Sequence, residues 1–267
     1  MIVNNIKFYN PCQKRINVCN FTGQTAKSSL KAQVLPEDLY FIRMENYFED
    51  RCWAHDMNNA TYVLSDMIRK NADFDVIWEK TMDSIRRINN NPSFCEIRTN
   101  GVAGYFMCNS AMRGREYYFK YKNKFIKNNG IKPKANEENL NSLTCTINGY
   151  ETNMFISYGV KSAKDYYLLK SIIKEQYNKL KAIQNPSDSE INRSVATIHW
   201  LIAQASPFKR GSDSFANLFT KAIYHSYGMY LSPAKKGISF DFEAFYSDLD
   251  EYIKNYPNFF EVKPKRK

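Results

Sequence analysis

The stretch that decides the fold is "SVATIHWLIAQASPFKRGSDSFANLFTKAI", residues 194–223. Apolar residues recur three and four positions apart on either side of a short polar turn, a spacing that predicts two amphipathic helices. Pro207 is expected to end the first helix by driving Ser206 toward an extended backbone. The second helix is expected to begin near Ser212, and Gly228 is placed to end it.

The turn between these helices has the composition of an anion-binding site. The first amides of a helix lack intrahelical partners and carry the positive end of its dipole. Gly211 would let a ligand approach the backbone, while Lys209 and Arg210 add positive charge. An ordinary turn, capped by Ser212 or Asp213 with both bases in solvent, is the alternative. The candidate phosphate- or nucleotide-binding residues are Ser206, Lys209, Arg210, Gly211, Ser212, Asp213 and Ser214.

Helical spacing also appears in other parts of the chain. Residues 36–90 and 162–183 show it, and Ser162 is a candidate cap for the second of these segments. Ser187 and Glu190 stand at the spacing of a capping box at the start of a further helix.

Two Asn-Gly steps predict β-hairpins. One lies within residues 94–108, and the other is Asn148-Gly149. The arms of the second are expected at residues 143–147 and 154–157, with extra residues after the turn. The sequence therefore predicts a mainly α protein with small β-hairpins, an α+β fold.

The chain of 267 residues is long enough for one large domain. We expect an irregular N-terminal segment at residues 1–35, a single helical domain with β-hairpin insertions at residues 36–262, and a basic tail at residues 263–267. This tail, "KPKRK", is expected to be solvated and frayed, with a targeting or anchoring patch as the alternative.

Composition narrows the class of protein. Hydrophobic residues make up 43% and aromatic residues 15%, which suffices for a sizeable core. There is no run of about 18 apolar residues, so no membrane span is expected. The N-terminus lacks the basic and apolar regions of a Sec-type signal peptide. The net charge of +11 favours polyanionic partners, namely nucleic acid, acidic lipid surfaces or phosphorylated ligands.

Residues suited to metal binding or catalysis are few. The 6 cysteines form no CxxC pair and there are only 3 histidines, so no metal site is expected. His199 and Asp213 are candidates for a catalytic base, although His199 also fits the edge of a core and Asp213 a helix cap. His55 and His225 lie in helical patterns and are expected to be structural.

Residues 113–127 interleave basic and aromatic side chains. This mixture suits single-stranded nucleic acid, whose bases stack on rings while cations follow the backbone. The period-two alternation equally describes an ordinary strand with one solvated face.

Residues 194–229 resemble the core of the Fic/Doc family, in which a loop of the form H-P-F-x-[D/E]-G-N-G-R joins two helices. Pro207, Phe208 and Gly211 match that loop. The resemblance implies a mainly helical fold in which a β-hairpin before the loop aligns a target peptide. Asn148 and Gly149 lie at that point in chain order and become the implied target-binding residues.

The loop also departs from the family pattern. The family's catalytic histidine falls on Ser206 and its acidic, metal-holding position on Arg210, while its Asn, Gly and Arg fall on Ser212, Asp213 and Ser214. A serine cannot act as the base at neutral pH, and an arginine cannot hold Mg²⁺ but can contact a phosphate. Ordinary adenylyl transfer is therefore not expected.

The sequence is closer to the degenerate AvrB-type effector branch of this fold, which has lost the histidine motif. That resemblance implies a bacterial virulence effector, secreted without a Sec signal into a host cell and otherwise cytoplasmic. It also implies a transferase that moves a group from a nucleotide or nucleotide-sugar to a host protein side chain. Two alternatives remain open: a non-catalytic module that binds a host protein or an acidic surface, and a nucleic-acid-binding protein.

Overall fold

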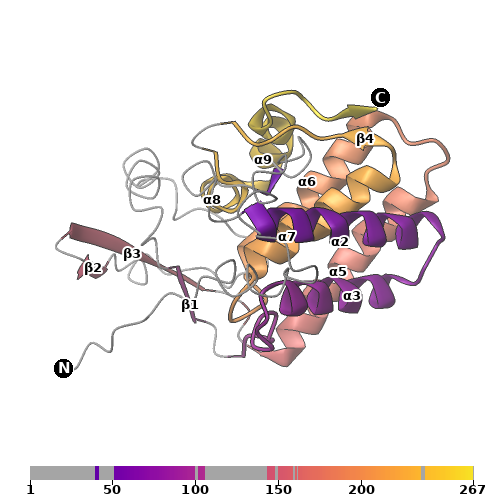
Figure 1. The fold of residues 1–267 in the computed structure, drawn as a ribbon. Helices are drawn as coiled ribbons and strands as arrows, with labels where there is room; N and C mark the ends of the chain where they lie inside the picture. The colour runs from indigo at the N-terminus through magenta and orange to yellow at the C-terminus, as the bar shows by residue number, and fades with distance from the viewer. Residues whose placement is uncertain are drawn as a thin grey trace, which may run out of the picture.

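A computed structural model describes residues 40–41, 51–99, 102–105, 143–147, 150–158, 160, 162–235 and 238–266. Helices dominate this part of the chain and pack into one body, with a small sheet to one side (Figure 1). The predicted class, mainly helical with small β-elements, is confirmed. The irregular segment expected at residues 1–35 lies outside the described residues.

Two helices come first in the described chain, α2 (Arg51–Arg69) and α3 (Phe74–Ile88). Asp73 begins α3, because its carboxylate accepts a hydrogen bond from the Asp75 amide at 2.7 Å. The helical prediction for residues 36–90 is confirmed from residue 51 onward.

The next two helices begin at the predicted caps. Ser162 precedes α5 (Ala163–Ala182), and its hydroxyl accepts a hydrogen bond from an amide of the first turn at 3.2 Å. Ser187 precedes α6 (Asp188–Ala205) and forms a complete capping box: its hydroxyl accepts from the Glu190 amide at 3.2 Å, and the Glu190 carboxylate accepts from the Ser187 amide at 2.7 Å. Such a cap contributes about 1 kcal/mol to stability.

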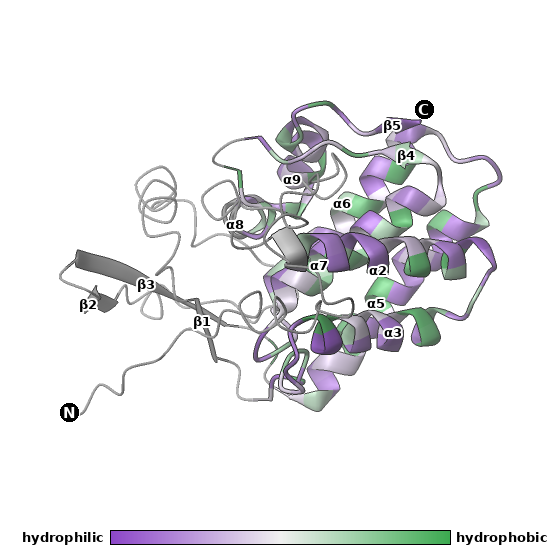
Figure 2. Cartoon of the chain, in the orientation of Figure 1, coloured by the Kyte–Doolittle hydropathy of each residue, from purple (hydrophilic) through white to green (hydrophobic). Residues whose placement is uncertain are grey.

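The central helix is α7 (Ser212–Ser226), which packs against α2, α3 and α6. Gly228 follows its last turn at φ +70°, and its amide donates to the His225 carbonyl at 3.1 Å, so the predicted stop is confirmed. The helices carry both hydrophilic and hydrophobic residues, as amphipathic helices do (Figure 2). The predicted apolar stripe of α7 is fully buried and consists of Phe215, Leu218, Phe219, Ala222 and Ile223.

Aromatic residues fill the core where α3, α5 and α7 meet. The ring centroids of Trp78 and Phe215 lie 4.5 Å apart, and Trp78 Nε1 donates a hydrogen bond to the Tyr166 hydroxyl at 2.9 Å. Each fully buried ring of this size contributes about 1.5–3 kcal/mol. No helix among the described residues is both long enough and apolar enough to cross a membrane.

The C-terminal part of the chain lies against α6 and α7. It contains a two-stranded antiparallel ribbon and three short helices. These elements are β4 (Met229–Tyr230), α8 (Phe240–Tyr246), α9 (Leu249–Asn255), the 3₁₀ helix η6 (Tyr256–Phe259) and β5 (Lys265–Arg266).

The expectation of a frayed basic tail is wrong for the described residues 263–266. Strand β5 pairs with β4, so that Arg266 lies opposite Met229. The Arg266 amide donates to the Asp188 carboxylate at 3.2 Å, and its guanidinium donates to the Pro186 carbonyl. Backbone pairing and the charge of Asp188 therefore hold the tail at the start of α6.

The small sheet contains β1 (Val102–Tyr105), β2 (Leu143–Ile147) and β3 (Tyr150–Tyr158) in the antiparallel order β1-β3-β2. Strands β2 and β3 form the second predicted hairpin, because Ile147 lies opposite Tyr150. The second arm begins at residue 150, and the expected extra residues before residue 154 belong to the strand.

The hairpin expected within residues 94–108 is not seen in the described part of the chain. Ile97 instead forms an antiparallel bridge with Phe208, and Val102 lies opposite Tyr158 in β3. Both pairings are long-range, so the local Asn-Gly step did not reveal them.

Candidate functional site

The predicted anion site lies in a bend between α6 and α7, residues 206–211. Helix α6 ends at Ala205, and Ser206 adopts a left-handed conformation with φ 42°. The expectation that Pro207 would hold Ser206 in an extended conformation is therefore wrong. The Ser206 amide donates the last α-helical hydrogen bond, to the Ile202 carbonyl at 2.9 Å.

Ser206 does not lie at the surface, as a phosphate-binding residue would have to. Its side chain is completely buried, and its hydroxyl donates to the Ala203 carbonyl at 3.0 Å. The position on which the resemblance places the Fic histidine is thus a helix cap inside the protein. Burial removes Ser206 from the candidate phosphate-binding residues in this structure.

A second segment lies along the bend and was not predicted. Residues 94–98, called the strap here, run antiparallel to residues 207–210. The Cys95 amide donates to the Arg210 carbonyl, the Lys209 amide to the Glu96 carbonyl, and the Arg98 amide to the Pro207 carbonyl, each at 2.9 Å. The strap therefore fixes the path of the bend from more than 100 residues away in sequence.

Besides the Ser206 amide, two further amides of the bend are already bonded to the chain. The Phe208 amide donates to the Ser212 hydroxyl at 3.1 Å, and the Lys209 amide is held by the strap. The Ser212 hydroxyl consequently points back into the bend and does not cap α7. The N-cap of α7 is Gly211, with no side-chain capping bond, so the alternative of a Ser212 or Asp213 cap is also wrong.

Position 211 requires glycine for two reasons: its backbone conformation and the closeness of the Phe94 ring. Its φ is +92°, which glycine adopts without strain. A Cβ at this position would lie 2.9 Å from Cδ1 of Phe94. The close approach that we expected from a ligand is made by the Phe94 ring.

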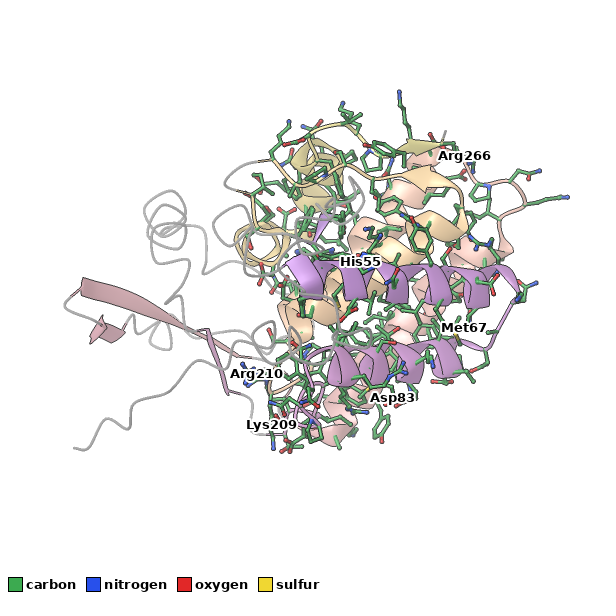
Figure 3. All side chains as sticks on the ribbon, in the orientation of Figure 1. His55, Met67, Asp83, Lys209, Arg210 and Arg266 are labelled. Atoms are coloured by element: carbon green, nitrogen blue, oxygen red, sulfur yellow. The ribbon has the colours of Figure 1, made fainter. Side chains whose placement is uncertain are left out.

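The two predicted cations of the bend differ in their surroundings. Both lie at the edge of the helical body, close to one another (Figure 3). The Lys209 ammonium contacts the Glu96 carboxylate, which partly neutralises it. The Arg210 guanidinium lies 4.6 Å from the centre of the Phe94 ring, a cation–π arrangement that leaves its edge N–H groups available for an anion.

The first turn of α7 supplies the remaining donors of the candidate site. The N-cap Gly211 offers no side-chain capping bond to its amides, which carry the positive end of the α7 dipole. Asp213 lies half-buried in this turn, and its carboxylate accepts a hydrogen bond from Asn217 Nδ2 at 2.7 Å. This carboxylate opposes a bound anion and is the second candidate base.

His199, the other candidate base, lies inside the core and not at its edge. Its Nδ1 shares a hydrogen bond with the Tyr256 hydroxyl at 2.8 Å, and Nε2 has no partner among the described residues. Burial lowers its pKa to about 3, so the imidazole is neutral at physiological pH. It has no exposed surface in this structure through which to reach a substrate.

The remaining histidines lie on helix surfaces. His55 is exposed on α2 (Figure 3), while His225 lies in the last turn of α7 with its ring 5.3 Å from that of Tyr62. Neither lies in the bend. Among the described residues, no three or more His, Cys, Asp or Glu side chains gather as metal ligands.

Two predicted surfaces fall outside the described residues. Asn148 and Gly149, the target-binding candidates, lie between β2 and β3, whose pairing is described. Residues 113–127, the basic and aromatic stretch, are outside as well. Both assignments stay predictions.

A depression of about 580 Å³ lies at the C-terminal end of α3, apart from the candidate anion residues. One of its walls is bonded to the strap, because Arg86 Nε donates to the Phe94 carbonyl at 3.1 Å. Within α3, Arg86 Nη1 also donates to the Asp83 carboxylate at 2.9 Å. The lining consists of Lys80, Asp83, Arg86, Arg87, Asn90, Asn91 and Pro92.

The strap residues Phe94, Glu96 and Arg98 are the site components that sequence reasoning missed. They fell within a stretch expected to form a local hairpin, and nothing in their spacing connects them with the bend. Arg98 was the only signal, since a basic residue in an apolar run must find acceptors if it is buried.

Comparison with known families finds a match over the part of the chain that contains α6, the bend and α7. Residues 158–263 match the AvrB/AvrC family model, described as avirulence protein. That range includes the bend but not the strap.

One curated relative is Avirulence protein B of Pseudomonas savastanoi pv. glycinea. It is 35% identical over 88 residues, a match that spans 32% of this chain and 27% of the relative. The two matches support the AvrB-type effector branch that the sequence resembles.

Proposed function

We propose that the protein is an AvrB-type bacterial effector, delivered into a host cell, and that its core is a degenerate Fic-like helical domain. The avirulence-protein match over residues 158–263 supports the effector role. The placement of Pro207, Phe208 and Gly211 between two packed helices supports the Fic-like core.

The proposed site binds a phosphate-bearing ligand at the N-terminus of α7. The observation that carries it is the start of α7 at Gly211, an N-cap with no side-chain capping bond, next to the guanidinium of Arg210. Amide N–H groups at a helix N-terminus and an arginine fork are complementary to phosphate oxygens. Lys209 contributes less, because Glu96 partly neutralises it.

A nucleotide or nucleotide-sugar is the proposed donor, and a host protein side chain near the β2–β3 hairpin is the proposed acceptor. The acceptor hydroxyl would form a bond to the transferred group as the bond to the phosphate breaks. The leaving phosphate keeps the electron pair and is held by Arg210, while the hydroxyl proton passes to a base. Asp213 is the only candidate base in the first turn of α7.

Isothermal titration with pyrophosphate, ADP and nucleotide-sugars tests this function. We expect Arg210→Ala to weaken binding at least tenfold and Lys209→Ala to weaken it less. Arg193→Ala is the matched control, since this exposed cation lies about 20 Å along α6 from the bend at 1.5 Å per residue. Failure of all three ligand classes to bind the unmodified protein would contradict the proposal.

A non-catalytic host-interaction module is the second candidate function. It is favoured by the bonded amides of Phe208 and Lys209, which close part of the bend. This candidate predicts no phosphate binding at the bend. Nucleic-acid binding through residues 113–127 stays a third prediction, tested by salt-sensitive oligonucleotide binding that is lost when Lys120 and Lys122 are changed.

A further inference from the structure

The guanidinium of Arg98 is the one strap side chain that reaches several carbonyls of the bend. Only 8% of the residue is exposed. Its Nε donates to the Ser206 carbonyl at 3.0 Å, and its Nη2 donates to the Phe208 carbonyl at 2.7 Å and reaches the Lys209 carbonyl at 3.4 Å. One planar fork therefore satisfies acceptors on both sides of Pro207.

These carbonyls follow the C-terminus of α6, where the helix dipole is negative. A cation at this end is favourable, and a buried carbonyl without a donor would cost free energy. Lysine has the same charge but cannot place two N–H donors in a fixed plane. Arginine is thus required at position 98 for the geometry of the bend.

The strap also leads into the small sheet. Strand β1 begins four residues after Arg98 and pairs with β3. Just after β3, the Val160 amide donates to the Ala205 carbonyl at 2.9 Å. The sheet is therefore attached to the end of α6 on one side and to the bend on the other.

We propose that Arg98 is a positioning residue. It holds the bend so that Arg210 and the first turn of α7 converge on one ligand, and it links this site to the sheet. The inference rests on the proposed function, because it concerns the same anion site. Arg98 acts through the carbonyls of the bend and does not touch the ligand. Loss of its fork moves the donors apart without removing any of them.

The first test is Arg98→Lys, titrated with inorganic pyrophosphate at a temperature where circular dichroism shows the variant folded. We expect Kd to rise at least tenfold, while the dependence of Kd on salt stays that of the unmodified protein. Arg210→Ala should weaken binding and also reduce the salt dependence, because it removes a cation that contacts the ligand. Lys181→Met is the matched control, since Lys181 also donates to a carbonyl, that of Ile68.

Unchanged pyrophosphate affinity in Arg98→Lys would overturn the inference. A reduced salt dependence equal to that of Arg210→Ala would overturn it as well, by placing Arg98 against the ligand. If the unmodified protein does not bind pyrophosphate, the proposed function fails on its own and the positioning role is decided by hydrogen exchange. The amides of Phe208 and Lys209 should then exchange at least tenfold faster in Arg98→Lys, and unchanged exchange rejects the role.

A measurement on the unmodified protein covers the case in which Arg98→Lys does not fold. Pyrophosphate at a saturating concentration should slow hydrogen exchange at the Arg98 amide, which donates to the Pro207 carbonyl away from the ligand. Slower exchange confined to residues 210–214 would show that the strap is not coupled to the site.

Discussion

His199 Nδ1 and the Tyr256 hydroxyl lie 2.8 Å apart in the core between α6 and η6. The rings of Phe240 and Tyr252 complete the surroundings of the imidazole, with centroids 5.3 and 6.4 Å away. A neutral imidazole fits this environment, whereas a charged one would be buried among aromatic rings.

The first prediction is that acid destabilises the protein through His199. Its pKa is lowered by burial from 6.5 to about 3, so the unfolded chain binds a proton more readily than the folded one between these values. The contribution is fully present above pH 6.5 and is lost as pH falls toward 3, at up to about 1.4 kcal/mol per pH unit. Urea unfolding between pH 7 and 4 measures it.

His199→Phe is the control for this titration. It should lower stability at pH 7, because the Tyr256 hydroxyl loses its hydrogen bond to His199. It should also reduce the slope of stability against pH, by the uptake of up to one proton. Carboxylates such as Asp75, whose pKa is lowered mainly by the hydrogen bond from Lys174, contribute equally to both proteins. Parallel curves for the two proteins would contradict the assignment to His199.

A second prediction concerns the space beneath Gly211. Gly211→Ala should destabilise the protein through a strained backbone and through contact of the new Cβ with Phe94. Gly228→Ala separates the two effects, because φ at Gly228 is +70° and no atom lies within 4 Å of its Cβ position. We expect about 1–2 kcal/mol for Gly228→Ala and about 1–3 kcal/mol more for Gly211→Ala in urea unfolding.

The double variant Gly211→Ala with Phe94→Ala provides the internal check. Removing the ring should relieve the contact, so the two substitutions should cost less together than the sum of their separate effects. Strict additivity would mean that the ring and the glycine do not interact.

The third prediction is that Asp213→Asn changes stability and anion binding in opposite directions. The carboxylate complements the α7 dipole, so its removal should lower stability by about 0.3–1 kcal/mol. The same change removes a negative charge from the candidate site and should tighten pyrophosphate binding several-fold. Weaker pyrophosphate binding would show that the anion does not bind near the first turn of α7.

The parts of this structure that could be predicted from the sequence are those determined by residues close together in the chain. The Ser187–Glu190 box and the apolar stripe of α7 depend on residues a few positions apart, and both were predicted. Ser206 was predicted incorrectly, because the bias that Pro207 imposes is outweighed by the bonds of the Ser206 hydroxyl to Ala203 and of its carbonyl to Arg98.

The candidate site was predicted only in part for the same reason. Lys209 and Arg210 stand out by charge, but the partners that distinguish them, Glu96 and Phe94, lie in the strap. Nothing in the spacing of these residues shows that the strap pairs with the bend, because the strap follows α3 and the bend precedes α7, two helices that pack together from distant parts of the sequence.

The last prediction makes Cys95 a reporter of the strap. Its thiol is buried and its pKa is raised by burial to about 12, so at pH 8 almost none of it is the reactive thiolate. Labelling should therefore require opening of the strap, because the Cys95 amide is bonded to the Arg210 carbonyl. Peptide mass spectrometry after timed treatment with iodoacetamide follows this residue alone. We expect Arg98→Lys to speed labelling at Cys95 and Lys181→Met to leave it unchanged, whereas equal acceleration in both variants would point to global unfolding as the route of exposure.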